Sequence, residues 1–159
     1  FRTNITADSE EYYKLLVYNG ILGGGIHSKL FRNVRENASL AYYIFSRLEK
    51  FKGLMVISSG IDADKREKAE EIILRQVKEI SEGNISDYEF DSTLKSIETG
   101  INSLNDSQLQ VVDFYLSQSI TGGSDTLHSL TEKVMKVRKK DVAEVASRIK
   151  LDTVYFLTP

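Results

Sequence analysis

Two short runs near the middle of the chain constrain its fold more than any other feature. Residues 41–45 and 54–57 are rich in aromatic, β-branched and other large apolar side chains, as strands are. Residues 49–53 between them are mostly charged and end in a glycine, which suits a turn. The pattern predicts an antiparallel hairpin in a chain whose remaining sequence is mostly helical.

Apolar residues at helical spacing predict helices on both sides of the hairpin. In the second of these helices, Ile26, Leu30, Phe31 and Val34 share one face. Gly23–Gly25 are expected to end the first helix, because glycine tolerates the left-handed backbone of a C-cap. The predicted helices cover residues 8–22, 26–34, 64–80, 86–101, 105–120 and 124–134, with a last one from residue 141.

Four pairs of residues spaced like a capping box predict where helices begin. Residues 1–5 are predicted to be the end of a truncated first strand, and residues 153–157 a closing strand. The four pairs are Asp8 with Glu11, Asp64 with Glu67, Ser86 with Glu89 and Asp141 with Glu144.

The order of these elements predicts an α+β fold. A strand, two helices, a hairpin, several helices and a closing strand favour a mainly antiparallel sheet covered on one face by several helices. Strands and helices do not alternate regularly, which disfavours a doubly wound parallel sheet. We expect one domain over residues 1–159, a length sufficient for a sizeable core.

Composition excludes several classes of partner and site. The chain has 21 basic and 23 acidic residues, a net charge of −2, so nucleic acid is not an expected partner. No apolar run approaches the roughly 18 to 20 residues of a membrane span, so no membrane partner is expected. The lack of cysteine fits a reducing compartment, and we expect a cytoplasmic protein. Because the chain starts at Phe1 and not at Met, we expect a fragment.

Isolated polar residues give weaker indications of a site. His27 and His128 are too few for a zinc site and are expected to be surface or cap residues. The triplet Gly23–Gly25 could cradle a phosphate near Lys29 and Arg32, but it lacks the P-loop pattern, which favours a structural role. Asp62 and Asp64 begin like a calcium loop, but the later glycine and glutamate are missing.

The segment from Leu22 to Tyr43 carries a denser pattern than any of these. Its characteristic parts are Leu22–Gly25, Ser28–Phe31, Val34–Glu36 and Ser39–Tyr42. In this pattern the segment resembles the C-terminal, non-zinc-binding domain of the insulinase/pitrilysin-type zinc peptidases, peptidase family M16. The resemblance extends over nearly the whole chain and implies the α/β sandwich-like half of such a peptidase, which is similar to a mitochondrial processing peptidase half.

The resemblance implies roles for Arg35 and Tyr42, which six residues separate. One half of such a peptidase carries a zinc-binding His-x-x-Glu-His, and the other half contributes this Arg and Tyr. The chain has no His-x-x-Glu-His. If the second helix ends near Asn37 and the strand starts near Leu40, the two side chains flank one corner. Their donors suit the carbonyl oxygens of a peptide and the oxyanion that forms during hydrolysis.

The resemblance therefore implies a non-catalytic, substrate-contacting half of a zinc-dependent endopeptidase. Zinc and the general base would come from a homologous partner half, in the same polypeptide or in a separate subunit. The chain would hold no catalytic residue, no metal and no cofactor of its own, and would cleave nothing alone. The alternative is a proteolytically inactive structural or binding subunit of the same fold. A minor third possibility is a domain that binds small anions at the glycine turn.

Overall fold

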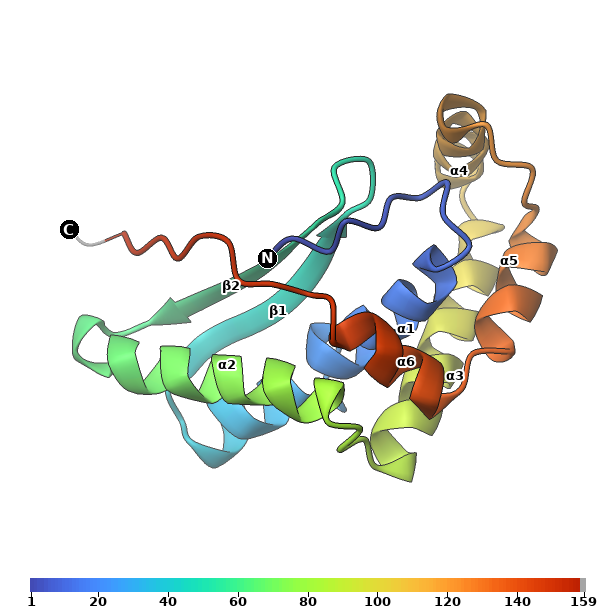
Figure 1. Ribbon diagram of the computed structural model, residues 1–159. Helices are drawn as coiled ribbons and strands as arrows, with labels where there is room; N and C mark the ends of the chain where they lie inside the picture. The colour runs from blue at the N-terminus through green and yellow to red at the C-terminus, as the bar shows by residue number, and fades with distance from the viewer. Residues whose placement is uncertain (158–159) are drawn as a thin grey trace.

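The computed structural model describes residues 1–157 and has an α+β fold. A single β-hairpin lies on one side of the molecule and helices lie on the other (Figure 1). The elements are α1 (Tyr12–Gly23), η1 (Phe31–Asn37), β1 (Ala41–Glu49), β2 (Leu54–Ile61), η2 (Ala63–Lys65), α2 (Arg66–Ser81), α3 (Asp87–Leu104), α4 (Gln108–Thr121), α5 (Leu127–Met135) and α6 (Lys139–Ala146).

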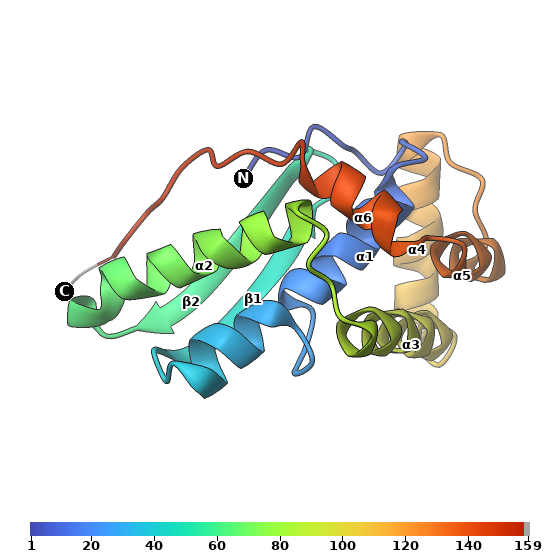
Figure 2. The same ribbon diagram turned by 60° about the horizontal axis from the view of Figure 1, so that its bottom comes forward.

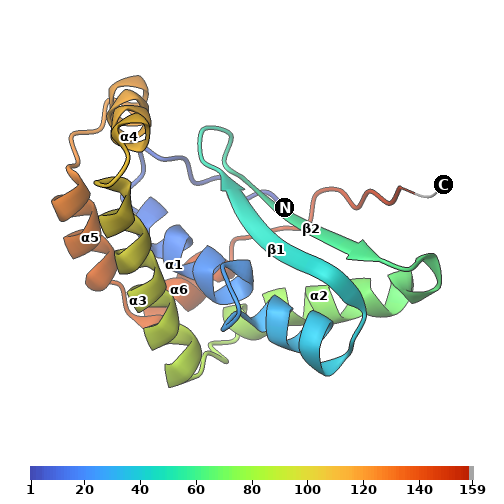
Figure 3. The ribbon, with the colours of Figure 1, turned by 180° about the vertical axis from the view of Figure 1, so that it is seen from behind.

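The predicted hairpin is confirmed. Strands β1 and β2 pair antiparallel, with Glu49 opposite Leu54 at the turn and Phe45 opposite Ser58 further along. Helices α1 and α2 lie along one face of this hairpin, as the view from behind also shows (Figure 3), and α6 packs against α1 and α2. Helices α3, α4 and α5 form a second group beyond α1 (Figure 2). The predicted α+β class with an antiparallel sheet is therefore confirmed, although the sheet among residues 1–157 has only two strands.

Helix α1 lies at the centre of the core. Its apolar residues are buried around most of its circumference, because the hairpin, α3 and α6 all pack against it. A helix that is hydrophobic on every side is expected at such a position. The fully buried side chains are Leu15, Val17, Tyr18, Ile21, Leu22, Leu30, Val34, Met55, Ile80, Val134, Val142 and Val145.

One predicted capping box is present where the sequence placed it. Helix α3 begins after Ser86, whose hydroxyl accepts from the amide of Glu89 while the Glu89 carboxylate accepts from the amide of Ser86. The prediction for Asp8 is wrong, because α1 begins at Tyr12 with no side-chain cap. The predictions for Asp64 and Asp141 are also wrong: Asp64 lies within η2, and Asp141 lies in the first turn of α6.

Gly23 ends α1, as predicted, but for a different physical reason. The C-cap, Gly24, has a φ of −86°, so the backbone is not left-handed there. Instead, a Cβ on Gly23 would lie 2.5 Å from the backbone nitrogen of Ser46, and one on Gly24 would lie 2.6 Å from the Cα of Gly20. Gly23 lets α1 and β1 approach closely, and Gly24 lets the chain turn back against the last turn of α1.

Neither predicted terminal strand forms a regular strand in the structure. Residues 1–5 contribute only isolated bridges, in which Arg2 pairs with Leu54 on one side and with Lys150 on the other. The predicted closing strand over residues 153–157 is wrong, because these residues have no regular structure. Ladder hydrogen bonds require a neighbouring strand, and within residues 1–157 the segment 151–157 makes none to another segment's backbone.

Candidate functional site

Arg35 and Tyr42 line the same surface hollow, which lies where the chain passes from η1 into β1. We call it the Arg35 hollow. Both side chains are exposed, and Tyr42 keeps 69% of its surface accessible. The geometry therefore brings together the two residues that the sequence singled out. The hollow is lined by Arg35, Ser39, Leu40, Ala41, Tyr42, Asp62 and Lys65.

A tight corner after η1 places the two residues together. The last turns of this segment are wide and π-helical, a geometry found frequently at functional sites. The chain then reverses through Ser39, which has a φ of 51°. The amide of Leu40 donates to the carbonyl of Val34 at 3.0 Å. Both side chains are buried in the core, so the corner is held against it. Arg35 and Tyr42 consequently lie on opposite arms of one bend.

A β-bulge aims Tyr42 into the hollow. Ala41 pairs with Ile61 and Tyr43 pairs with Gly60, so two steps along β1 match one step along β2. Tyr42 is the extra residue and has no cross-strand partner in this register. Such bulges redirect a side chain, and they are common next to active sites. The phenol of Tyr42 thereby reaches over the end of β2 to Asp62.

Asp62 forms the polar centre of the hollow. The Tyr42 hydroxyl donates to Asp62 Oδ1 at 2.8 Å, and Lys65 Nζ donates to Oδ2 at 2.6 Å. The hydrogen bond from Lys65, followed by that from Tyr42, lowers the pKa of Asp62. Donation to this carboxylate raises the pKa of Tyr42 above its ordinary value. At neutral pH the phenol is therefore protonated, and its proton is directed to Asp62.

Arg35 is the open donor of the hollow. Its guanidinium stacks over the ring of Phe31, 4.8 Å from the ring centroid, which orients it by a cation–π contact. Among the side chains of residues 1–157, no carboxylate forms an ion pair with it. Its planar set of donors is thus available to a carbonyl or carboxylate oxygen that enters the hollow.

This arrangement limits the chemistry that the hollow can perform. A phenol carries one proton, so a Tyr42 that donates to Asp62 cannot donate to an oxyanion at the same time. The side chains of Arg35, Lys65 and Asp62 together carry a net charge of about one positive unit. The hollow suits a neutral carbonyl or a carboxylate better than an oxyanion that forms during hydrolysis.

The block from Leu22 to Tyr43 also contributes two residues to a second, buried group of polar side chains. Lys29 Nζ lies 3.1 Å from Glu89 Oε1, and both side chains are less than 10% exposed. His27 Nε2 lies 3.0 Å from the hydroxyl of Thr93. The expectation of a surface His27 is wrong, because it is only 7% exposed. We call Lys29, Glu89, His27 and Thr93 the buried cluster; it ties the block to α3.

The buried cluster is satisfied internally and offers nothing to a ligand. Burial works to raise the pKa of Glu89, but hydrogen bonds from Ser86 and from Lys29 outweigh it and hold the pKa below its ordinary value. Burial lowers the pKa of His27, opposed by the charge of Glu89. Because the charge of Lys29 is neutralised, an anion site at the glycine turn loses its main cation.

The described part of the chain does not fit a metal site. Among residues 1–157, no three His, Cys, Asp or Glu side chains are grouped so that they could hold an ion. His128 is exposed, as expected, and lies 3.6 Å from Glu132, while His27 is buried against Thr93. The residues present thus do not fit the zinc of an M16 peptidase. Likewise, no described helix combines the length and apolar character of a membrane span.

The sequence did not predict Asp62 and Lys65 as site residues. In the sequence, Asp62 is only part of an incomplete calcium loop, and no pattern includes Lys65. Their place in the hollow depends on the bulge at Tyr42 and on the turn η2, neither of which has a sequence pattern that could have been recognised beforehand. The available signal was the short Asp-Ala-Asp-Lys stretch directly after a strand.

Comparison with known proteins identifies the family of the chain. Residues 1–97 match the family described as Peptidase M16 inactive domain. A probable inactive metalloprotease of Bacillus subtilis, YmfF, is 37% identical over 157 residues, which is 99% of this chain and 37% of that protein. An uncharacterized zinc protease of the same organism, YmxG, is 24% identical over 88% of this chain and 35% of that protein. The chain spans little more than one third of either relative.

Solved structures agree with this assignment. A conserved protein from Enterococcus faecalis has a TM-score of 0.86 and 30% identity, over 92% of this chain and 35% of that one. The peptidase M16 inactive domain from Pseudomonas fluorescens has a TM-score of 0.81 at 19% identity, over 91% of this chain and 35% of that one, and it shares the fold. This chain belongs to the peptidase M16 inactive domain family.

Proposed function

We propose that this chain is a proteolytically inactive binding domain whose Arg35 hollow holds an oxygen of an extended peptide. The observation that carries the proposal is the division of roles inside the hollow. Arg35 is exposed and has no carboxylate partner among residues 1–157, whereas the proton of Tyr42 is directed to Asp62. The hollow can therefore bind a carbonyl or carboxylate group, but it is not arranged to stabilise a forming oxyanion.

The relatives support this proposal in part. The relative with 37% identity is named a probable inactive metalloprotease, and the matching family is described as an inactive domain. Inactivity is a property of those proteins, and we extend it to this chain because its described residues lack a metal-binding group. That the bound partner is a peptide is part of what we propose.

A second candidate is the non-catalytic half of an active zinc endopeptidase. The shared hollow of Arg35 and Tyr42 favours it, as does the relative named a zinc protease. In that case a homologous partner half would supply the zinc and the general base. To support the reaction, the Tyr42 hydroxyl would have to break its hydrogen bond to Asp62 and donate to the substrate instead.

Peptide binding tests the first proposal. A short fluorescent peptide with a flexible backbone is titrated with the wild type, Arg35→Ala, Tyr42→Phe and Arg32→Ala. Arg32 is the matched control, because it is an exposed arginine of η1 that stacks on Tyr88 and not in the hollow. We expect Arg35→Ala to weaken binding roughly tenfold, the loss of one charged hydrogen bond. Equal affinities for Arg35→Ala and Arg32→Ala would contradict the proposal that Arg35 binds the peptide.

Reconstitution separates the two candidates. The chain is mixed with a homologous zinc-bearing half, whether this belongs to the same polypeptide or to a separate subunit, and cleavage of the same peptide is followed. The first proposal expects no cleavage by the wild-type assembly. The second expects cleavage that Tyr42→Phe reduces by about a hundredfold or more, as for the loss of one oxyanion donor. A rate that the substitution leaves unchanged would contradict the second candidate.

A further inference from the structure

Helix α4 lies at one end of the molecule and packs against it through one face, mainly on α3 (Figure 1, Figure 3). No residue of α4 is fully buried, and the helix lies outside the hydrophobic core. The side chains on its packed face are only half-buried. They are Val111, Phe114, Ser117, Gln118 and Thr121.

The opposite face of α4 carries a row of exposed apolar side chains. Leu109, Val112, Leu116 and Ile120 are 70%, 59%, 55% and 65% exposed. Their spacings of three and four residues place them one above the other along the helix. We call this row the α4 stripe. Because the outer face of a surface helix is ordinarily polar, an apolar row there indicates a face that another helix or surface covers.

The ends of α4 are well defined although its packing is not. The Ser107 hydroxyl accepts from the amide of Gln110, and Gly122, with a φ of 70°, ends the helix in the left-handed conformation. A helix of 14 residues is only marginally stable in water by itself, and most helices in proteins are stabilised by packing. The α4 stripe is the packing surface that this helix has not used within residues 1–157.

The α4 stripe is also nearly free of charge. Asp113, at the edge of the stripe, is the one charged residue among the 14 of α4. By contrast, half of the 16 residues of α2 are charged. The centres of protein interfaces are depleted of charged residues in this way. Since the stripe itself carries no charge, two copies of it can meet without repulsion between like charges.

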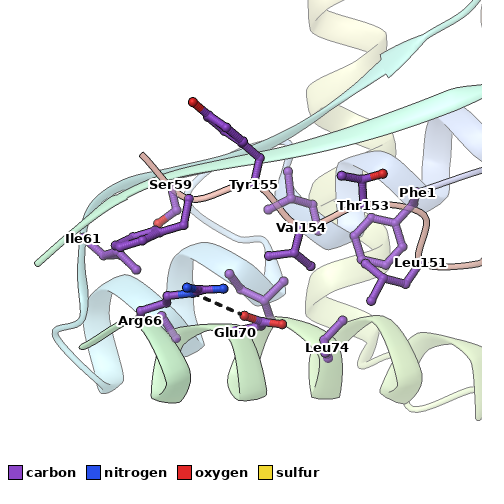
Figure 4. Close-up of a pocket in the computed structure, with 14 residues that line it drawn as sticks. Phe1, Ser59, Ile61, Arg66, Glu70, Leu74, Leu151, Thr153, Val154 and Tyr155 are labelled. Atoms are coloured by element: carbon purple, nitrogen blue, oxygen red, sulfur yellow. Dashed lines mark ion pairs between the residues drawn. The ribbon is translucent and has the colours of Figure 1, made fainter. Parts of the chain in front are cut away.

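Another exposed apolar surface of the molecule differs from the α4 stripe. A cavity of about 170 Å³ lies between β2, α2 and residues 151–157 (Figure 4). Arg66 and Glu70 of α2 form an ion pair beside it, at 3.9 Å, and the ring of Phe156 lies over Arg66. Charges therefore interrupt that surface, and the chain itself partly covers it. Within residues 1–157, no residue of α4 takes part in an ion pair.

We propose that the α4 stripe binds the α4 stripe of a second copy of this chain, with the two helices antiparallel about a two-fold axis. The order of side chains is nearly the same from either end of the stripe. A two-fold axis at its middle places Leu109 opposite Ile120 of the second copy, and Val112 opposite Leu116. Each contact then occurs twice, as a two-fold interface requires. Asp113 remains at the rim of the pair, in contact with water.

The size of the α4 stripe determines how strong this dimer can be. Four partly exposed aliphatic side chains offer roughly 300 Å² per copy, on the order of the largest apolar patch of an ordinary monomer. Standard interfaces bury about 800 Å² per partner, so we expect a weak and reversible dimer.

The dimer leaves the Arg35 hollow of each copy open. Lys50, at the turn of the hairpin, donates to Ser117 of α4 at 2.6 Å, whereas the hollow lies at the opposite end of the hairpin. The inference therefore does not depend on the role of the hollow.

Sedimentation velocity over a range of concentrations tests the proposal. We expect the wild type to change from a monomer of 18.0 kDa to a dimer of twice that mass between about 10 µM and 1 mM. Leu116→Lys, which places a charge in the middle of the stripe, should weaken the dimer at least tenfold. Ile26→Lys is the matched control, because Ile26 is 72% exposed but lies beside Ser86, before the other end of α3, and it should dimerise like the wild type.

A charge-pairing experiment shows whether the partner is a second copy in the stated orientation. Val112→Glu and Leu116→Lys should each be monomeric alone, because each homodimer would bury charges without partners. An equimolar mixture of the two should dimerise again, since the introduced carboxylate and ammonium then face each other. Both positions are exposed, and melting curves confirm that the variants are folded.

Three results would overturn the proposal. A wild type that stays monomeric up to about 1 mM would show that the α4 stripe has a different partner or none. A Leu116→Lys protein that dimerises like the wild type would place the interface elsewhere. A mixture of the two charged variants that stays monomeric would exclude the antiparallel pairing.

Discussion

The block from Leu22 to Tyr43 contributes to two polar groups with opposite surroundings. In the buried cluster, Lys29 and Glu89 are sealed from solvent and satisfied by each other and by Ser86. In the Arg35 hollow, Asp62 is satisfied but Arg35 is left open to the solvent. The comparison shows that one short segment holds itself in place with its first half and presents binding groups with its second half.

The energetics of the two groups differ for the same reason. Removing one partner of a buried ion pair leaves an uncompensated charge in a medium of low polarity, which is costly. An exposed charge that loses its partner is solvated by water, so exposed pairs contribute little to stability. Substitutions in the buried cluster should therefore change folding, and substitutions in the hollow should change binding.

The largest effect is expected for Glu89→Ala, which leaves Lys29 buried without its partner. We expect the free energy of unfolding to fall by about 3–5 kcal/mol, as measured by urea denaturation. The double variant Glu89→Ala with Lys29→Met should recover much of the loss, since no buried charge then remains. Glu132→Ala, which removes an exposed carboxylate beside His128, is the control and should change stability by less than about 0.5 kcal/mol. A stable Glu89→Ala protein would show that the buried cluster is dispensable.

The same pair should be visible in the pH dependence of stability. The folded pKa of Glu89 lies below its ordinary value of 4.5, so its ionised form is favoured by folding. Its contribution is present above pH 4.5 and is lost as the pH falls through the lowered folded value. The stability advantage of the wild type over Glu89→Gln should therefore shrink below that pH. An advantage that stays constant down to strongly acidic pH would contradict the assignment.

The next effect concerns the close contact between α1 and β1 at Gly23. In Gly23→Ala the new Cβ would lie 2.5 Å from the Ser46 backbone nitrogen, so α1 and β1 must separate. We expect a loss of about 1–3 kcal/mol in thermal or urea unfolding, typical of overpacking. Gly100→Ala is the matched control, because nothing lies near its Cβ in α3 and alanine is the better helix former. If both variants were stabilised, the close approach at Gly23 would be unimportant.

A smaller effect is expected for Tyr18→Phe. Tyr18 is fully buried, and within residues 1–157 its hydroxyl has no hydrogen-bond partner, unlike the polar atoms of the buried cluster. Removing an unsatisfied hydroxyl should leave stability unchanged or raise it by up to about 1 kcal/mol. Calorimetry of the two proteins measures this difference. A clear loss of stability would mean that the hydroxyl is satisfied in solution.

The smallest effect on folding is expected for Arg35→Ala. The side chain is exposed and contacts mainly the ring of Phe31, so the free energy of unfolding should change by less than about 0.5 kcal/mol. The same variant should lose peptide affinity, which separates binding from folding within one block. A destabilisation comparable to that of Glu89→Ala would remove the contrast between the two groups.

The parts of the fold that depend on local sequence could be predicted. The hairpin and the Ser86–Glu89 capping box rest on neighbouring residues, and both are confirmed. The pattern in α4 also predicted a helix correctly. It could not show that Leu109 and Ile120 would be 70% and 65% exposed, because periodicity identifies a shared face but not what covers it.

The parts that depend on distant neighbours could not be predicted. Ile26 was placed on the same face as Leu30, but it is 72% exposed and the adjacent His27 is buried against Thr93 of α3. Residues 153–157 have strand-like side chains but no paired neighbour. In the hollow, Arg35 and Tyr42 were found through the family resemblance, whereas Asp62 required the register of the bulge.

The proton of Tyr42 is committed to Asp62 in the Arg35 hollow, and titration of the Tyr42 ring by NMR tests this hydrogen bond directly. The wild type should titrate above the ordinary tyrosine value of 10.0, because the hydroxyl donates to the carboxylate. In Asp62→Asn the pKa should fall back towards that value. A Tyr42 that titrates near 10.0 in both proteins would contradict the account, since the phenol would then be free to serve an oxyanion.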